Sequence, residues 1–246
     1  MRVFLLSGEY NKDGFYALRA KEKQYLSKVL RLKIGTVFTA KDKKENYYRA
    51  ELIDEDTLSL ESSACPEETL LDGLSGYKGE FHSITMFLSL LKGKKNELVV
   101  RALTEMGIER IVFVRTQFVQ EKELTSHQIE RLDAIVKEAV QQSGAKALEI
   151  EGPIDFDEAI EKCPSNSIIL HQSPRNETKC LSETIREMDS EKPFGCFIGP
   201  EGGFSDSECE KAENKGIKTV LLNTNILRAE TAAVYASAAL QTLLQG

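Results

Sequence analysis

The strongest constraint on the fold is a regular alternation of short apolar segments with helix-like segments from Phe81 onward. The strand-like runs, rich in β-branched or aromatic residues, cover 83–91, 110–115, 167–172, 194–199 and 219–223. The helix-like segments between them end at Gly107, Gly144 and Gly216. Because run 83–91 is apolar almost throughout, we expect that strand to be buried on both faces. The alternation therefore predicts an α/β fold with a mostly parallel sheet covered by helices.

A smaller β-rich module precedes this pattern. Strands are predicted over 3–6, 36–41, 47–54 and 57–61, with one short helix at Lys21–Leu32. The stretch Cys65–Gly79 contains one proline and three glycines, which indicates a linker. The prediction is therefore two domains, 1–70 and 78–246.

The charge is unevenly distributed between these two parts. The whole chain of 246 residues carries a formal charge of −7, which by itself argues against a nucleic-acid partner. Residues 1–49, however, contain 12 Lys or Arg against 5 Asp or Glu, and the remaining residues contain 20 against 34. This asymmetry suggests a basic binding module, although a solvated lysine-rich surface gives the same count.

Cysteine and histidine usage indicates no disulfide framework and no metal site. The five cysteines are widely spaced without a CxxC pair, and the three histidines lie far apart. No segment reaches the roughly 18–20 apolar residues of a membrane span, and the N-terminus lacks the features of a signal peptide. These observations predict a cytoplasmic protein with no membrane partner.

The turn Gly199–Ser205 is the first candidate binding segment. It follows an apolar strand and precedes a helix that Ser205 and Glu208 can open as a capping box. Ligands of open α/β sheets bind beyond the carboxyl ends of strands, and glycines let the backbone approach a ligand closely. The turn is neither a Walker A loop nor a GxGxxG motif, which disfavours a nucleoside triphosphate and a dinucleotide oxidoreductase. A tight turn that merely needs glycine is the alternative.

Three further segments carry polar groups at element ends. Arg228 and Glu230 stand in an otherwise small and apolar stretch after the last strand, where a salt bridge or a helix start would also explain them. The basic turn Lys92–Glu97 could contact RNA phosphates or simply be solvated. Glu138 with Gln141–Gly144 could contact bases, but a helix end is the simpler interpretation.

These segments, in this order, resemble the RsmE family of 16S rRNA uridine-N3 methyltransferases in the SPOUT superfamily. The matching pieces are YLSKVLRLKIG, KGKKNELVVRALTEMGI, EAVQQSG, FIGPEGGFS and LNTNILRAETA, which together span Arg2 to Leu240. GPEGG and ILRAETA are specific when they occur together at this separation.

The resemblance implies an N-terminal PUA-like β-barrel for RNA binding and a C-terminal SPOUT domain with a trefoil knot. It also implies a homodimer, S-adenosylmethionine as cofactor, and 16S rRNA or the 30S subunit as partner. The implied cofactor-binding residues are Leu170, His171, Gly199, Pro200, Glu201, Gly202, Gly203, Leu222, Asn223, Ile226, Leu227 and Thr231. The expected RNA-binding residues are Arg19, Lys28, Arg31, Lys92, Lys94 and Lys95.

The expected catalytic residues are Arg228 and Glu230. Arg228 would stabilise negative charge on the uracil oxygens, and Glu230 would orient Arg228 or accept the N3 proton. The chain departs from the family pattern at Asn223, Asn225 and Ala145. Two alternatives therefore stay open: a SPOUT enzyme acting on another RNA nucleotide, and a non-catalytic RNA-binding or ribosome-assembly factor.

Overall fold

The computed structural model describes residues 3–8, 10, 13–44, 46–63, 81–173 and 178–244. The chain divides into two compact units, Met1–Gly79 with Val140–Gly144, and Glu80–Ala139 with Ala145–Gly246. The predicted linker Cys65–Gly79 lies outside the described residues. Within the described residues, no helix combines the length and the apolar character needed to cross a membrane.

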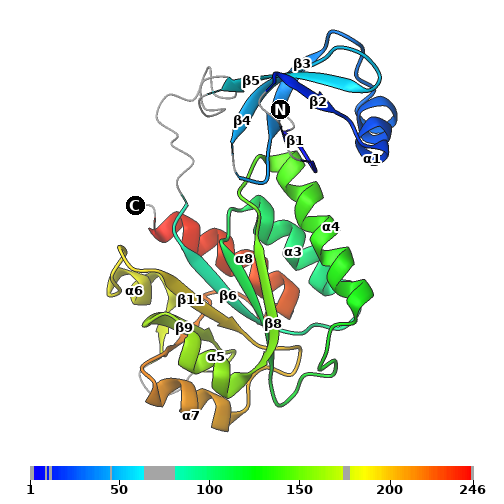
Figure 1. The fold of residues 1–246 in the computed structure, drawn as a ribbon. Helices are drawn as coiled ribbons and strands as arrows, with labels where there is room; N and C mark the ends of the chain where they lie inside the picture. Colours follow the sequence, from blue (N-terminus) through cyan, green and yellow to red (C-terminus); the bar gives the residue numbers. More distant parts are fainter. Residues whose placement is uncertain are drawn as a thin grey trace. The chain divides into compact units, whose positions relative to one another are not determined.

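The first unit is built on a five-stranded mixed sheet in the order β1-β3-β4-β5-β2 (Figure 1). Its strands are β1 (Phe4–Leu5), β2 (Phe15–Ala17), β3 (Val37–Lys41), β4 (Tyr47–Leu52) and β5 (Thr57–Ser63). The pair β1–β3 is parallel, and the other pairs are antiparallel. Four strands lie where the sequence predicts them, and β2 was not predicted. In the described residues β1 and β2 are the outer strands of the curled sheet and do not pair with each other, so the predicted barrel-like module is a half-barrel.

A short helical segment packs on this sheet through a buried carboxylate. Helix α1 (Ala20–Gln24) continues into a π-helical turn, η1 (Tyr25–Val29), within the predicted range. Glu22 is buried, and its Oε1 accepts hydrogen bonds from the backbone of Ser7 at 2.9 Å and from the Tyr16 hydroxyl at 2.8 Å. The Glu22 carboxylate therefore has its hydrogen-bond partners inside the unit, whereas the basic side chains on the outer side of the same segment are exposed.

The second unit contains a seven-stranded, all-parallel sheet in the order β10-β12-β9-β11-β6-β7-β8. Its strands are β6 (Ile84–Ser89), β7 (Arg110–Arg115), β8 (Glu149–Asp155), β9 (Asn166–Leu170), β10 (Lys179–Cys180), β11 (Phe194–Ile198) and β12 (Lys218–Leu221). The parallel sheet is confirmed, while β8 and β10 were not predicted. Central strand β11 is buried along its whole length, as its apolar sequence indicates.

Helices cover this sheet and bring its loops to one end. They are α3 (Lys95–Glu105), α4 (Ser126–Ser143), α5 (Phe156–Lys162), α6 (Leu181–Arg186), α7 (Asp206–Asn214) and α8 (Ala229–Leu244). Residues of α5 and α7 form a core cluster with Phe87 of β6, Val112 and Val114 of β7, Ile169 of β9 and Phe197 of β11. Helices α3 and α8 lie side by side (Figure 1). Since β12, β9 and β11 are adjacent and parallel, their carboxyl ends and the loops that follow them converge.

Candidate active site

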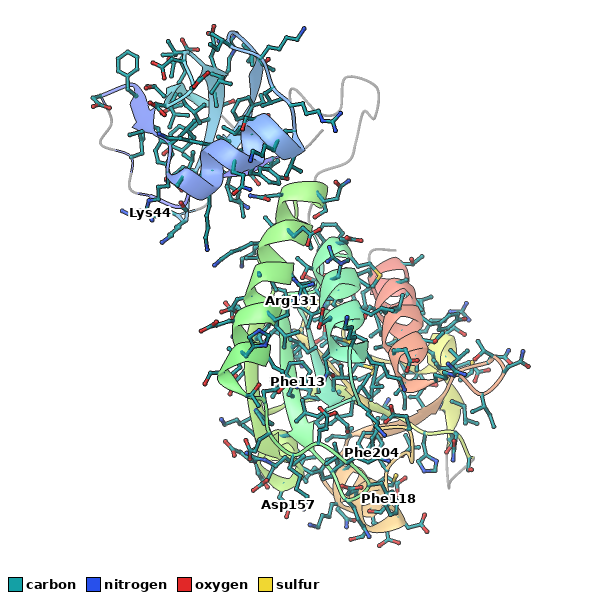
Figure 2. All side chains as sticks on the ribbon, turned by 90° about the vertical axis from the view of Figure 1, so that its right-hand side faces the viewer. Lys44, Phe113, Phe118, Arg131, Asp157 and Phe204 are labelled. Atoms are coloured by element: carbon teal, nitrogen blue, oxygen red, sulfur yellow. The ribbon has the colours of Figure 1, made fainter. Side chains whose placement is uncertain are left out.

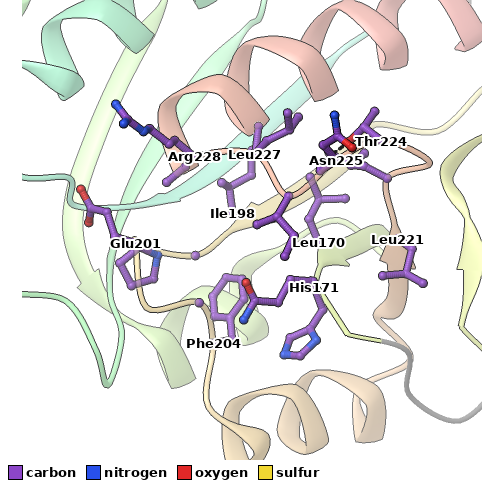
Figure 3. A pocket seen from close by; sticks show the side chains of 18 residues that line it. Leu170, His171, Ile198, Glu201, Phe204, Leu221, Thr224, Asn225, Leu227 and Arg228 are labelled. Atoms are coloured by element: carbon purple, nitrogen blue, oxygen red, sulfur yellow. Dashed lines mark hydrogen bonds between the residues drawn. The ribbon is translucent and has the colours of Figure 1, made fainter.

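The loops after β9, β11 and β12 enclose a cavity of about 320 Å³ (Figure 3). Apolar side chains from the strand ends form much of its wall, and the loop backbones complete it. The lining residues are Leu170, His171, Gln172, Ile198, Gly199, Pro200, Glu201, Gly203, Phe204, Leu221, Leu222, Thr224, Asn225, Ile226, Leu227, Arg228, Ala229 and Ala232. The two turns that the sequence singles out therefore meet in one cavity.

The loop after β11 needs its glycines because other atoms crowd it. A Cβ added at Gly199 would lie 3.0 Å from the carbonyl carbon of Gly203, and one at Gly202 would lie 3.0 Å from Cβ of Phe118. Gly203 itself has a φ of 73°, which favours glycine. Phe118 comes from the segment after β7, and Figure 2 shows it at the same end of the second unit as Phe204. The loop is thus tightly folded where it borders the cavity.

The far end of this loop is held by Glu208, the third residue of α7. The predicted capping box is confirmed: the Glu208 backbone donates to Ser205 Oγ at 3.3 Å, and Glu208 Oε2 accepts from the Ser205 backbone at 2.8 Å. Oε1 of the same buried carboxylate accepts a hydrogen bond from the Gln117 backbone at 2.7 Å. This second bond, which the sequence did not predict, links the loop to the segment after β7.

A lysine connects the near end of the loop to α8. Lys95 Nζ lies 2.5 Å from Glu201 Oε1 and 3.4 Å from Glu230 Oε2. Burial is the largest single influence on the Glu201 pKa and raises it, but the hydrogen bond and charge of Lys95, together with hydrogen bonds to the backbone of Glu201 and Lys92, outweigh burial and lower the pKa. The same hydrogen bond raises the pKa of Lys95. The Lys95 ammonium and the Glu201 carboxylate are therefore both charged around neutral pH.

The two expected catalytic residues differ in their surroundings. Arg228 lines the cavity and is exposed, and its guanidinium has no hydrogen bond or ion pair within the described part of the chain. Figure 3 shows Arg228 and Glu201 on the same side of the cavity. Glu230 is not a lining residue; its buried Oε2 lacks a hydrogen bond and meets Lys95 only as an ion pair. Glu230 is thus paired with Lys95, whereas the Arg228 guanidinium at the cavity has no charged partner among the described residues.

Most of the expected cofactor-binding residues lie on the cavity wall. Those that line it are Leu170, His171, Gly199, Pro200, Glu201, Gly203, Leu222, Ile226 and Leu227. Gly202, Asn223 and Thr231 belong to the same loops or to the start of α8 but do not line the cavity. Ile198, Phe204 and Leu221 also line the cavity. They fall within the two candidate segments but were not among the expected cofactor-binding residues.

The expected RNA-binding residues are divided between the two units. Arg19, Lys28 and Arg31 are exposed in the first unit, and in its described residues none of them forms an ion pair. Lys92 and Lys94 are exposed in the turn before α3 of the second unit. Lys95 differs from these five because its charge is already engaged by two carboxylates.

A family match places the chain, with its parallel sheet and three converging loops, in a class of RNA-modifying enzymes. Residues 79–241, more than half of the chain, match the model of a family described as RNA methyltransferase domain, so the chain belongs to that family. Ribosomal RNA small subunit methyltransferase E 2 of Borreliella burgdorferi is 33% identical over 165 residues, which cover 66% of this chain and 67% of that protein. The chain is therefore a member of the RsmE family.

Two further comparisons extend over nearly the whole chain. Ribosomal RNA small subunit methyltransferase E of Buchnera aphidicola is 27% identical and covers 98% of this chain and 93% of its own. The crystal structure of a ribosomal RNA small subunit methyltransferase E from Neisseria gonorrhoeae bound to S-adenosyl methionine has a TM-score of 0.78 at 25% identity. The structural match covers 99% of this chain and 98% of the Neisseria gonorrhoeae chain, so both units of the fold are shared.

Proposed function

We propose that this protein transfers a methyl group from S-adenosylmethionine to N3 of a specific uridine in 16S rRNA. The observation that carries the proposal is the cavity at the carboxyl ends of β9, β11 and β12, with Arg228 on its wall. Membership of the RsmE family and the cofactor-bound Neisseria gonorrhoeae relative support the same activity. The proposed substrate is the RNA alone or the 30S subunit that contains it.

The cavity suits S-adenosylmethionine in its chemistry. Apolar side chains such as Leu170, Ile198 and Leu227 offer surfaces for a flat adenine ring, and the loop backbones offer hydrogen-bonding groups beside them. Gly199 has no room for a side chain, which keeps the backbone accessible at the wall. The ionised Glu201 adds a negative group that favours a cationic ligand. When bound, S-adenosylmethionine supplies an electrophilic methyl group on a sulfonium.

The chain's own residues must prepare the uracil for attack. N3 lies on the Watson–Crick edge, so the base must be unpaired or flipped out before it can react. Loss of the N3 proton leaves negative charge on the ring oxygens, which the unpaired guanidinium of Arg228 can stabilise. Glu230 is proposed to act through the start of α8, either by orienting Arg228 or by accepting the proton.

RNA binding is proposed to rest on the basic side chains of both units. Arg19, Lys28 and Arg31 are exposed and unpaired in the described first unit, as phosphate contacts require. Lys92 and Lys94 are exposed just before α3. The first residue of that helix, Lys95, contacts Glu201 on the cavity wall. We accordingly propose residues 1–70 as a PUA-like RNA-binding domain and residues 78–246 as the methyltransferase domain.

The remaining expectations are proposals of the same kind. A trefoil knot would bring together two loops far apart in the sequence, and the loops after β11 and β12 do line one cavity. A homodimer would cover exposed apolar side chains on α3 and α8, where Leu98 and Tyr235 are 54% and 45% exposed. A cytoplasmic location follows from the proposed ribosomal substrate.

Calorimetry with S-adenosylmethionine separates this function from its rivals. The proposal predicts saturable binding to the wild-type protein and methyl transfer to small-subunit rRNA in its presence. A protein that binds this RNA but has no affinity for S-adenosylmethionine would be a ribosome-assembly factor with the same fold. Transfer to a different nucleotide would identify a SPOUT enzyme of another specificity.

A further inference from the structure

The Lys95 ammonium lies between two carboxylates that belong to different segments near the cavity. Glu201 is in the loop after β11 and lines the cavity, whereas Glu230 is in the first turn of α8. Lys95 is itself the first residue of α3, and its Nζ contacts both, at 2.5 Å and 3.4 Å. One side chain therefore connects three segments that are distant in the sequence.

Among the described residues, no cation other than Lys95 forms an ion pair with Glu201 or Glu230. Around them, Glu97 on α3 pairs with Arg131 at 3.2 Å, and Glu121 accepts a hydrogen bond from the Gly93 backbone at 3.3 Å. Arg228, Lys92 and Lys94 are the nearby cations on the neighbouring segments, and all three are exposed.

The geometry gives Lys95 more influence than a surface ion pair has. Its side chain is 31% exposed, and Oε2 of Glu230 is buried without a hydrogen bond. Without the ammonium, Glu201 would lose the group that stabilises its charge and would have Glu230 as its charged neighbour on α8, so the Glu201 pKa would rise. Arg228 precedes Glu230 by two residues, so the direction of its guanidinium depends on the same helix start.

We propose that Lys95 is a positioning residue for methyl transfer, which holds the Gly199–Ser205 loop and the Arg228-bearing start of α8 together through its contacts with Glu201 and Glu230. The proposal rests on the function proposed above and assigns this lysine a role different from phosphate contact. Lys95 acts through other residues and touches neither the methyl group nor the base.

Lys95→Met tests this role when calorimetric affinity for S-adenosylmethionine and turnover are measured from pH 8 to pH 6. In the wild type the affinity stays constant, because Lys95 keeps the Glu201 pKa below its usual range. In Lys95→Met the Glu201 carboxylate, which has lost its cation, takes up a proton as the pH falls, and the affinity for the cationic ligand drops by about tenfold. Turnover falls by roughly tenfold to a hundredfold at pH 8, because Arg228 is no longer held in place.

Three variants separate positioning from general stability. Lys95→Arg retains the charge and is expected to restore the pH-independent affinity. Lys95→Met combined with Glu201→Gln removes the like-charge pair, so the new pH dependence disappears. Lys162→Met is the matched control, because Lys162 also bridges two glutamates, Glu158 at 2.8 Å and Glu151 at 3.5 Å, outside the cavity wall.

The outcomes distinguish this inference from the proposed function. A wild-type protein without affinity for S-adenosylmethionine overturns the proposed function, and the role of Lys95 with it. If the wild type binds and transfers, while Lys95→Met keeps a constant affinity and normal turnover from pH 8 to pH 6, only the positioning role is wrong. A lower unfolding temperature without a changed pH profile would likewise make Lys95 merely structural.

Discussion

The two units hold their charged groups in opposite ways. In the first unit, the buried Glu22 is satisfied internally, and Arg19, Lys28 and Arg31 stay exposed without ion pairs in the described residues. At the cavity of the second unit, the charges of Glu201 and its neighbours are engaged by Lys95, and Arg228 alone faces the cavity without a partner. A count of charges can therefore indicate a basic surface, but it cannot locate a reaction centre.

This contrast predicts different consequences of substitution in each unit. Exposed charges in the first unit act additively and are screened by salt, so their loss changes RNA affinity and its salt dependence. Groups at the cavity act through fixed contacts, so their loss changes cofactor affinity or turnover.

Arg228→Ala is expected to lower the rate of methyl transfer by about a hundredfold to a thousandfold, because the uracil oxygens lose a charged donor. Affinity for S-adenosylmethionine and the unfolding temperature should change little, since the guanidinium has no partner in the described chain. Single-turnover kinetics with 30S subunits measures the effect. Arg186→Ala, an exposed arginine on α6, is the control. Near-normal turnover of Arg228→Ala would remove Arg228 from catalysis.

Gly199→Ala is expected to weaken S-adenosylmethionine binding by roughly tenfold to a hundredfold. The new Cβ would crowd the backbone of Gly203 at 3.0 Å and force the loop to shift, and such overpacking costs about 1–3 kcal/mol. Calorimetry measures the affinity, and binding of RNA to the same variant should stay normal. Unchanged cofactor affinity would show that this loop does not bind S-adenosylmethionine.

Glu208→Gln is expected to destabilise the second unit by about 1–3 kcal/mol, because the buried carboxylate accepts from both Ser205 and Gln117 and an amide cannot replace every acceptor. Urea unfolding measures the loss. Glu210→Gln, an exposed glutamate on the same helix, should have no such effect. Equal stabilities of the two variants would contradict the proposed anchoring of the loop.

The combined change Arg19→Gln, Lys28→Gln and Arg31→Asn is expected to reduce RNA affinity by about tenfold at physiological salt. In a plot of log affinity against log salt concentration, the slope should become shallower by about 2. Each of the three lost phosphate contacts reduces the magnitude of that slope by roughly 0.7. S-adenosylmethionine affinity should not change. Removal of the same number of charges at Lys162, Lys211 and Lys218 provides the control, and an equal loss of RNA affinity there would contradict a binding surface on the first unit.

Much of the second unit could be predicted from local sequence because its central strands are continuous apolar runs. Strands β6, β7 and β11 fall where the periodicity places them, and the Ser205–Glu208 capping box forms as predicted. Strand β8 was missed because Glu149–Asp155 is polar and includes Gly152 and Pro153. Its strand character comes from pairing with β7, which no local pattern reveals.

The cavity could be predicted only in part for a similar reason. Glycine-rich and charged turns mark the loops after β11 and β12, so Gly199 and Arg228 stand out from the sequence alone. The ion-pair partner of Glu230 could not be predicted, because Lys95 comes from a helix more than 100 residues earlier in the chain. The basic turn around Lys95 suggested RNA phosphate, whereas the fold brings two carboxylates to its ammonium.

The central claim is methylation of uridine N3 in small-subunit rRNA, and one measurement tests it most directly. Mass spectrometry of nucleosides from 16S rRNA compares a strain lacking this protein with the same strain complemented by the wild type and by Arg228→Ala. The account predicts that N3-methyluridine is lost in the deletion strain, returns with the wild type and stays absent with the variant. Retention of N3-methyluridine in the deletion strain would contradict the account.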